Sequence, residues 1–362
     1  MSVTNTTFLL ADLTASLSDQ RDRESLDMAL ARVLMELLEP ASVGIHLLLS
    51  DASEQRWLPA VTLERGGTPV LHEAMHVDLR RLPRVVADSP RQRSLEASLP
   101  VVVEDLETQP ACLTCLPLFA GRENEESGVI EIQSEARLDD HAMACIERVL
   151  RVYRNMHHLF MYSERDALTG LLNRKSFEET FYKSLRQEPL PPEGTPVFAG
   201  SGETWPQRRL RARERFWLAM VDVDHFKQVN DQYGHQIGDE VLILVARILK
   251  NTFRGYDQVY RFGGEEFVVL LRCPDASAAL QIAERFRLKM DQYRFPQVGR
   301  ITVSVGLSAI GSGDAPEVVC NRADQAVYFA KRHGRNRVCS HDDLVQQGLL
   351  QAEVRDGGVE LF

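Results

Sequence analysis

The sequence has no long apolar stretch and no excess of basic residues. No uninterrupted apolar run approaches the roughly 18 residues that indicate a membrane-spanning helix. The segment Met1–Leu17 contains no Lys or Arg, so it lacks the basic start of a secretory signal peptide. The 42 Lys and Arg residues are outnumbered by 52 Asp and Glu residues. We therefore expect a cytoplasmic protein with no membrane partner and no duplex nucleic acid partner, since binding to a duplex depends on neutralising phosphates.

Cysteines are also few. The chain has six in 362 residues, at Cys112, Cys115, Cys145, Cys273, Cys320 and Cys339. They are too scattered for the disulfide framework of a small secreted domain, so reduced thiols are expected. Hydrophobic residues make up 44% of the chain and charged residues 26%, which is typical of a soluble globular protein. The length suits two domains better than one.

The first half of the chain has the pattern of a helix followed by an antiparallel sheet. Apolar residues recur at helical spacing from Asp19 to Leu38, and Pro40 ends the pattern. Short β-rich runs separated by polar turns follow at Val43–Leu49, Trp57–Leu63, Leu99–Val103, Cys115–Phe119 and Gly128–Gln133.

A long helix is predicted between Asp139 and Ser163. Its apolar residues Ile146, Val149, Tyr153, Met156 and Phe160 follow one another in alternating steps of three and four. Such a narrow seam favours two helices that pack side by side, and hence a homodimer. The alternative is a helix that lies on the sheet of its own domain.

The second half of the chain predicts a βαββαβ order with one added helix. The strands are expected at Phe216–Val221, Gln258–Phe262, Glu266–Arg272 and Arg300–Ala309, and the helices at Asp239–Phe253, Ala276–Tyr293 and Pro316–Arg332. Gly263 and Gly264 predict a hairpin, since glycine accepts the positive φ that tight hairpin turns require. We expect a sheet that contains antiparallel strands, with the helices on one face.

The segment Glu188–Arg215 fits neither half. It contains five prolines, followed by Arg208, Arg209, Arg211, Arg213 and Arg215. We interpret it as a flexible insertion whose arginine run is a solvated surface rather than a binding site for phosphates or an acidic partner.

Four acidic residues stand where strands end. Asp222 and Asp224 close an apolar strand, and Glu265 and Glu266 follow the two glycines. If the hairpin pairs beside the first strand, one of these glutamates meets Asp222 across the sheet. Converging carboxylates repel unless they share a cation, and Mg²⁺ held by one or two carboxylates and substrate phosphates is a common solution. The alternative is a pair of acidic turn residues in water.

The string around the glycines, Arg261-Phe262-Gly263-Gly264-Glu265-Glu266-Phe267, resembles the GGEEF form of the GGDEF signature of diguanylate cyclases. Four further motifs of that family occur in order. They are Asp166-Ala167-Leu168-Thr169-Gly170-Leu171-Leu172-Asn173-Arg174, Asp222-Val223-Asp224-His225-Phe226-Lys227-Gln228-Val229-Asn230-Asp231, Gly234-His235-Gln236-Ile237-Gly238-Asp239 and Ala330-Lys331-Arg332-His333-Gly334-Arg335-Asn336. The resemblance covers residues 166–340 and implies a palm-like, ferredoxin-related fold, so that the whole chain is α+β.

The resemblance also implies roles for single residues. Asp222, Glu265 and the carbonyl of Val223 correspond to ligands of Mg²⁺ or Mn²⁺, and Asn230 and Asp239 to the pair that reads guanine. The phosphate-binding residues correspond to Lys331, Arg335 and Lys227, together with the backbone N–H groups of His225 and Phe226. Gly263 and Gly264 allow the hairpin to pass close to the triphosphate. Glu266 corresponds to a residue that accepts a proton or completes a second metal site.

The implied reaction joins two GTP molecules into cyclic di-GMP. The 3′-hydroxyl of each attacks the α-phosphorus of the other, and pyrophosphate leaves. Each domain holds one GTP, so two copies must face each other. Arg254 and Asp257 have the Arg-x-x-Asp spacing of the family's product-inhibition site; the alternative is a surface ion pair. The rival hypothesis for the whole domain is a silent module that only binds GTP or cyclic di-GMP.

Residues 18–157 resemble a GAF domain in length and in their ending, with residues 139–165 as a connecting signalling helix. The ligand of this sensor half, a small molecule or a protein, is not evident from the sequence.

His72-Glu73-Ala74-Met75-His76 has the residue pattern of a zinc protease motif, which we interpret as coincidence because no long helix or third ligand accompanies it. Cys112 and Cys115 have metal or redox spacing, but two structural thiols are the favoured interpretation.

Overall fold

The structure is a computed structural model that describes residues 15–51, 54–72, 77, 82–104, 110, 112–119, 127–185, 215–254 and 257–351. The chain divides into two compact units. The first runs to Glu164 and the second begins at Arg165. Most of the predicted insertion at 188–215 lies outside the described residues; Arg215 is described and begins a strand.

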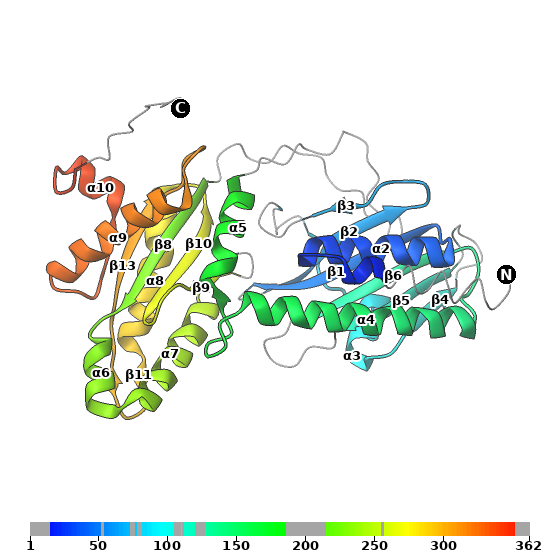
Figure 1. The fold of residues 1–362 in the computed structure, drawn as a ribbon, viewed down its shortest axis with the longest axis horizontal. Helices are drawn as coiled ribbons and strands as arrows, with labels where there is room; N and C mark the ends of the chain where they lie inside the picture. The colour runs from blue at the N-terminus through cyan, green and yellow to red at the C-terminus, as the bar shows by residue number, and fades with distance from the viewer. Residues whose placement is uncertain are drawn as a thin grey trace. The chain divides into compact units, whose positions relative to one another are not determined.

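The first unit is built on a six-stranded antiparallel sheet with the order β3-β2-β1-β6-β5-β4 (Figure 1). Its elements are α2 (Arg23–Leu38), β1 (Ser42–Asp51), β2 (Glu54–Glu64), β3 (Val70–Leu71), α3 (Pro90–Ala97), β4 (Val101–Glu104), β5 (Cys112–Phe119), β6 (Ser127–Ser134) and α4 (Asp140–Glu164). The predicted helix and five strands are all present, and α3 and β3 are additions. Helices α2 and α4 share one core with the sheet, whereas α3 packs on β4, β5 and β6.

The apolar seam of α4 lies in this core. Ile146, Val149 and Tyr153 are buried, and Met156 and Phe160 pack against the same cluster. The hydroxyl of Tyr153 donates a hydrogen bond to Asp27 of α2 over 2.5 Å. The expectation that this seam joins two copies is therefore wrong, because its side chains are already used inside the unit.

The second unit contains a six-stranded mixed sheet with the order β14-β13-β8-β10-β9-β7. Its strands are β7 (Leu172–Asn173), β8 (Arg215–Val223), β9 (Gln258–Arg261), β10 (Glu266–Cys273), β13 (Val303–Ala309) and β14 (Arg337–Ser340), with β11 (Arg294–Phe295) and β12 (Gly299–Arg300) forming a separate hairpin. Its helices are α5 (Arg174–Leu185), α6 (Phe226–Tyr233), α7 (His235–Lys250), α8 (Ala276–Gln292), α9 (Pro316–Arg332) and α10 (His341–Gln346). The predicted βαββαβ order is present, with α6 inserted after the first strand.

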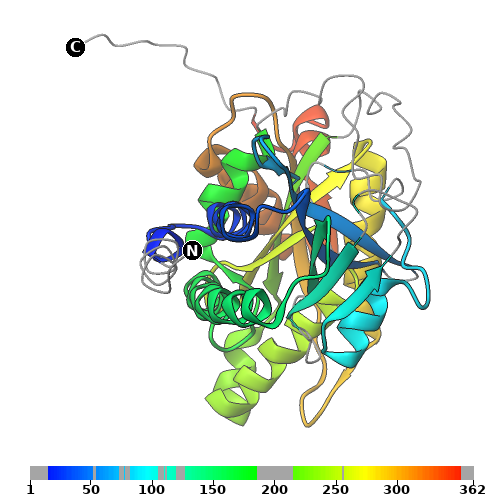
Figure 2. The same ribbon diagram turned by 90° about the vertical axis from the view of Figure 1, so that its right-hand side faces the viewer.

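Helices cover both faces of this sheet, so the prediction of helices on one face is wrong (Figures 1 and 2). Trp217, Ala219 and Val221 of β8 lie in one core cluster with residues of α7 and α8. Leu218 and Met220 lie in a second cluster with residues of α5 and α9. A strand buried on both faces has a nearly continuous apolar sequence, and β8 is buried from Trp217 to Val223.

The two glycines of the hairpin do not serve the predicted turn conformation, and Gly263 has a steric role instead. Strands β9 and β10 pair antiparallel, and the N–H of Phe262 donates to the carbonyl of Glu266 over 2.8 Å. Neither Gly263 nor Gly264 has a positive φ, so the expected backbone requirement is wrong. A Cβ at Gly263 would lie 2.5 Å from Oε2 of Glu266, whereas one at Gly264 would meet open space. Glycine at 263 makes room for the Glu266 carboxylate.

Candidate active site

Asp222 lies at the end of β8, between two neighbouring strands. The register places it opposite Glu266 of β10 on one side and Ser304 of β13 on the other. Its side chain is almost fully buried, and Nζ of Lys331 lies 2.7 Å from its Oδ2. Burial raises the pKa of Asp222, Lys331 opposes that shift, and Asp224 and Asp324 add to it.

Glu265 completes a group of three acids with Asp222 and Glu266. Partial burial raises the pKa of Glu265, and the nearby charges of Asp222 and Glu266 raise it further, while Lys331 acts in the opposite direction. The N–H of Val223 donates to the carbonyl of Glu265 over 3.3 Å, which ties the glycine turn to the end of β8. The acids that the sequence separates by more than forty positions are therefore neighbours in the fold.

This acidic group suits a hard divalent cation. Within the described parts of the chain, no three His, Cys, Asp or Glu side chains form a ready-made metal cage. Mg²⁺, however, commonly takes one or two carboxylates and completes its shell with water and substrate phosphates. A carboxylate whose pKa is raised by a neighbouring carboxylate, as that of Glu265 is by Asp222, is stabilised in the charged form when the two share a cation.

Asp224 is engaged differently from Asp222. It is 4% exposed, and its carboxylate accepts hydrogen bonds from the hydroxyls of Thr302 and Ser304, both over 2.7 Å. It also accepts from the backbone N–H of Asn336 over 3.0 Å. These bonds occupy most of the acceptor capacity of the carboxylate.

The next two helices carry Asn230 and Asp239. Asn230 lies on α6 and Asp239 is exposed in the first turns of α7, and these helices pack against each other. Gly238 lies between them, and a Cβ there would be only 1.9 Å from Oδ1 of Asn230. Glycine at 238 thus allows the Asn230 amide to lie beside the start of α7.

The start of α6 presents backbone N–H groups near the acids. His225 precedes the helix with a φ of 61°, and its carbonyl accepts from the N–H of Gln228 over 2.9 Å. The first N–H groups of a helix have no partner within the helix and favour anions. His225 and Lys227 are exposed, whereas the side chain of Phe226 is buried in the core.

The other cations come from the end of α9. Lys331 lies in its last turn, and Arg335 lies in the turn that follows. Gly334, Arg335 and Asn336 have φ values of 106°, 59° and 46°. The N–H of Arg335 donates to the carbonyl of Ala330 over 2.9 Å, which closes the end of the helix.

Arg261 and Asp166 form a link to which the sequence analysis gave no role. The Arg261 guanidinium donates to the carbonyl of Gly264 over 2.9 Å and to both carboxylate oxygens of Asp166 over 3.0 and 3.2 Å. Asp166 also accepts from the N–H and hydroxyl of Thr169. Burial acts to raise the pKa of Asp166, but these hydrogen bonds and the charge of Arg261 together lower it. The sequence carried one signal for this link: Asp166 and Arg261 have opposite charges, and each lies in one of the motifs quoted above.

Comparison with known proteins shows what this unit is similar to. The family model described as "Diguanylate cyclase, GGDEF domain" matches residues 202–337. Among curated proteins, diguanylate cyclase DgcP of Pseudomonas aeruginosa is 36% identical over 218 residues, which cover 58% of this chain and 29% of that protein. Diguanylate cyclase DgcM of Escherichia coli is 33% identical over 213 residues, covering 59% and 46%.

Residues 202–337 thus match a GGDEF domain.

The chain spans less than half the length of these two curated relatives. Among solved structures, the coiled coil and GGDEF domain of DgcB from Caulobacter crescentus, in complex with c-di-GMP, is 27% identical, with a TM-score of 0.44; the match covers 55% of this chain and 97% of that one. The active GGEEF domain of a diguanylate cyclase from Vibrio cholerae is 34% identical, with a TM-score of 0.34, covering 36% and 83%.

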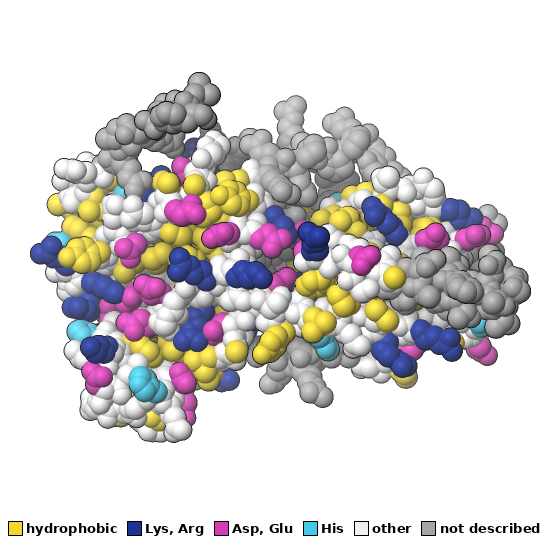
Figure 3. Space-filling view, in the orientation of Figure 1, with side chains coloured by type: hydrophobic (Ala, Val, Ile, Leu, Met, Phe, Trp, Pro, Cys, Tyr) yellow, Lys and Arg dark blue, Asp and Glu magenta, His cyan; other side chains and the backbone are white. Residues whose placement is uncertain are grey.

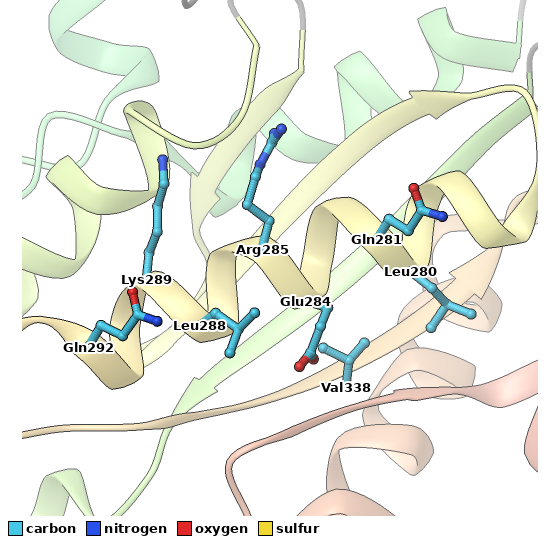
Figure 4. Close-up of a pocket in the computed structure, with 8 residues that line it drawn as sticks. All are labelled: Leu280, Gln281, Glu284, Arg285, Leu288, Lys289, Gln292 and Val338. Atoms are coloured by element: carbon cyan, nitrogen blue, oxygen red, sulfur yellow. The ribbon is translucent and has the colours of Figure 1, made fainter.

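A groove runs along α8 of the GGDEF domain, and none of the three acids of the site lines it. It is lined by Leu280, Gln281, Glu284, Arg285, Leu288, Lys289, Gln292 and Val338. In Figure 4 Arg285 and Lys289 extend from one side of α8, whereas Glu284 and Leu280 extend toward Val338. Arg285 donates to the carbonyl of Thr252 over 2.7 Å, so the groove adjoins the turn that carries Arg254.

Arg254 and Asp257 of the GGDEF domain lie at that turn. Asp257 is 8% exposed, and its carboxylate accepts from the N–H of Arg254 over 3.0 Å and from the N–H of Arg272 over 3.4 Å. Gly255 and Tyr256 lie outside the described residues. Asp257 is therefore buried, which disfavours the alternative interpretation of a surface ion pair.

The first unit has two motifs with the residue spacing of metal sites, and the structure tests only one of them. Cys112 and Cys115 are both buried on β5, where residues three apart project to opposite faces of the sheet. Burial, reinforced by Glu131, raises the pKa of Cys115 to about 12, which keeps the thiol protonated. This geometry opposes a shared metal or disulfide. Of the His72–His76 motif, only His72 is described, so that motif is not tested.

No helix in the described parts of the chain is both long and apolar enough to span a bilayer. On the face that Figure 3 shows, acidic and basic side chains are interspersed over each unit.

Proposed function

We propose that this protein condenses two GTP molecules into cyclic di-GMP and releases two pyrophosphates. The observation that carries the proposal is the convergence of Asp222, Glu265 and Glu266 at one end of the sheet, next to Lys331, in a domain of the GGDEF family. Asp222 lies on β8, the two adjacent glutamates lie at the start of β10 and Lys331 lies on α9, so only the fold brings these three places together.

The residues present fit a divalent cation, Mg²⁺ or alternatively Mn²⁺. Asp222, Glu265 and the carbonyl of Val223 would hold it. When bound, such a cation neutralises charge on the triphosphate and lowers the pKa of a hydroxyl that it polarises.

The chain's own residues bind and orient the nucleotide. Asn230 and Asp239 would read the guanine edge, since a carboxylate accepts from the N1 and N2 donors that adenine lacks in this arrangement. Lys331, Arg335 and Lys227 supply positive charge for the phosphates, and the backbone N–H groups of His225 and Phe226 supply donors. Glu266, which folds over Gly263, is the candidate to accept the proton of the attacking 3′-hydroxyl.

A homodimer is required because one domain binds one GTP. The inner seam of α4 packs inside its own unit, so we assign the dimer contact to the outer face of the same helix. Leu159 and Tyr162 lie on that face and are 62% and 82% exposed. Large exposed apolar side chains of this kind are characteristic of an interaction surface when they adjoin each other.

Two regulatory properties belong to the same proposal. Arg254 and Asp257 form the product site, and the adjoining groove along α8 adds Arg285 and Lys289 as cations for the phosphates of cyclic di-GMP. The first unit acts as a GAF-like sensor of a small molecule or protein signal. Its antiparallel sheet, with α2 and α4 on one face and α3 on the other, is compatible with that type of domain.

The rival function is a silent module that binds GTP or cyclic di-GMP without converting it. Silent copies usually lose the acids of the signature, whereas Asp222, Glu265 and Glu266 are all present. This observation favours the enzyme.

Incubation of the purified full chain with GTP and Mg²⁺ tests the proposal. We expect cyclic di-GMP and pyrophosphate, identified by chromatography and mass, and we expect Glu265→Ala to form neither. Pyrophosphate release that persists in Glu265→Ala would count against the assignment. Tight GTP binding without turnover by the wild type would favour the silent module.

A further inference from the structure

Asp224 connects the metal-binding end of β8 with the turn that carries Arg335. Oδ1 accepts from the hydroxyl of Ser304, and Oδ2 accepts from the hydroxyl of Thr302 and from the N–H of Asn336. The N–H of Asp224 donates to the carbonyl of Thr302 over 2.9 Å. The carboxylate is thus enclosed by β13 and by the segment after α9, and it does not point freely toward a ligand.

The turn that Asp224 contacts has an unusual backbone. Gly334, Arg335 and Asn336 have three successive positive φ values. The left-handed region disfavours residues with a Cβ, although Asn tolerates it better than most. Two non-glycine residues in this region need support from their surroundings.

Two charged side chains supply that support at Asn336. Asp224 accepts from its backbone N–H over 3.0 Å, and Arg287 of α8 donates to its Oδ1 over 2.7 Å. A hydrogen bond to a charged group is stronger than one between neutral groups. Arg335 directly precedes Asn336, so contacts that hold Asn336 also restrict the backbone of Arg335.

We propose that Asp224 is a positioning residue: it fixes the turn from Gly334 to Asn336 and thereby holds Arg335 for the phosphates of GTP. The inference rests on the proposed function for the role of Arg335, but the contact between Asp224 and the turn does not. It also assigns different tasks to the two aspartates of one motif. Asp222 is left to bind the cation, while Asp224 builds the phosphate site.

A double-mutant cycle tests the proposal in the full chain. Binding of the non-reactive analogue guanosine 5′-(α,β-methylene)triphosphate, with Mg²⁺, is measured by calorimetry for wild type, Asp224→Ala, Arg335→Ala and the double variant. We expect Asp224→Ala to weaken binding about tenfold, the effect of one charged hydrogen bond. In the Arg335→Ala background, the same change should alter affinity less than about twofold.

Independent multiplicative losses in the cycle would overturn the proposal, since Asp224 would then act on the nucleotide or metal without Arg335. Asp224→Asn keeps an acceptor and the shape of the side chain, and it should lose less affinity than Asp224→Ala. This second variant keeps the test meaningful if Asp224→Ala does not fold.

Amide hydrogen exchange, measured without nucleotide, tests the contact between Asp224 and the turn independently of GTP binding. Residues 333–338 should exchange faster in Asp224→Asn and Asp224→Ala than in wild type, and unchanged exchange would overturn the proposal. Glu178→Ala, an exposed acid on α5, should leave this segment unchanged. If the wild type binds no GTP analogue, the proposed function fails and Arg335 loses its assigned role, whereas the exchange result still decides whether Asp224 holds the turn.

Discussion

Nζ of Lys331 lies 2.7 Å from Oδ2 of Asp222. The residue proposed to bind phosphate is thus paired, without nucleotide, with a residue proposed to bind the cation. Lys331 partly offsets the raised pKa values of both Asp222 and Glu265, so its charge acts on both of these carboxylates. A divalent cation that arrives alone must compete with this ammonium.

Replacement of Lys331 should therefore have opposite effects on metal and nucleotide. Lys331→Gln is expected to tighten binding of Mn²⁺ alone, measured by electron paramagnetic resonance, because the competing charge is removed. The same variant should weaken GTP binding about tenfold or more through loss of a charged hydrogen bond. Lys175→Gln, at an exposed lysine of α5, is the control. Weaker binding of Mn²⁺ alone by Lys331→Gln would contradict the competition.

Glu265 should reduce the stability of the metal-free protein at neutral pH. Burial and the charge of Asp222 raise its pKa, so the folded state binds more protons than the unfolded state between the two pKa values. Stability from this group is complete below the ordinary pKa and is lost as pH rises through the raised one. Glu265→Gln should accordingly have a higher Tm than wild type at pH 7.

That difference in Tm should close as the pH falls below about 4.3, the ordinary pKa of glutamate, where the wild-type side chain is protonated. Scanning fluorimetry over this range in the presence of a chelator measures it. Glu178→Gln should show no such gap. A gap that widens toward acid would have the wrong sign.

Loss of the link between Asp166 and Arg261 should impair turnover through the glycine turn. Asp166→Asn removes the charge that holds Arg261, which in turn holds the carbonyl of Gly264. We expect a fall in kcat of about tenfold and a loss of roughly 1 kcal/mol of stability at pH 7. Asp166→Asn combined with Arg261→Gln should be no worse than Arg261→Gln alone; additive losses would show that the two residues act separately.

The pH dependence of this pair has the opposite sign to that of Glu265. The pKa of Asp166 is lowered in the folded protein, because hydrogen bonds from Thr169 and Arg261 outweigh its burial. Its contribution is present above the ordinary pKa of aspartate, about 3.9, and is lost as pH falls through the folded value. The Tm difference between wild type and Asp166→Asn should shrink as the pH falls below the ordinary pKa of aspartate, about 3.9.

Gly238 should determine affinity for GTP through Asn230. A Cβ at 238 would lie 1.9 Å from Oδ1 of Asn230, so Gly238→Ala must displace that amide. We expect an increase in KM for GTP similar to that of Asn230→Ala. In the Asn230→Ala background the obstacle is absent, and Gly238→Ala should then change KM little. An equal effect in both backgrounds would indicate a change in α7 itself.

Charge on the outer face of α4 should separate the two copies. Leu159→Glu combined with Tyr162→Glu is expected to shift the protein toward monomer in light scattering and to reduce specific activity at low protein concentration. Leu99→Glu is a matched control, since Leu99 and Leu159 are both 62% exposed. A dimer of unchanged affinity in the double variant would place the contact elsewhere.

The sequence by itself determined the order of elements and the motifs of the second unit. The apolar strand that ends at Asp222, the hairpin around Gly263 and the following helices depend on local periodicity and turn residues, which neighbours in the chain decide. The motif residues Asn230, Asp239, Lys331 and Arg335 were also recognisable, because a motif is a set of residue types at a fixed spacing along the chain.

Only the tertiary structure decided which faces are buried and which charges meet. The seam of α4 has the spacing of a dimer contact and of a core contact alike, and the partner became clear only once Tyr153 was found against Asp27. The two faces of β8 require helices from distant parts of the chain. The bonds of Asp224 to Asn336 and of Arg261 to Asp166 span 112 and 95 positions, and no local pattern specifies which groups such long-range contacts will join.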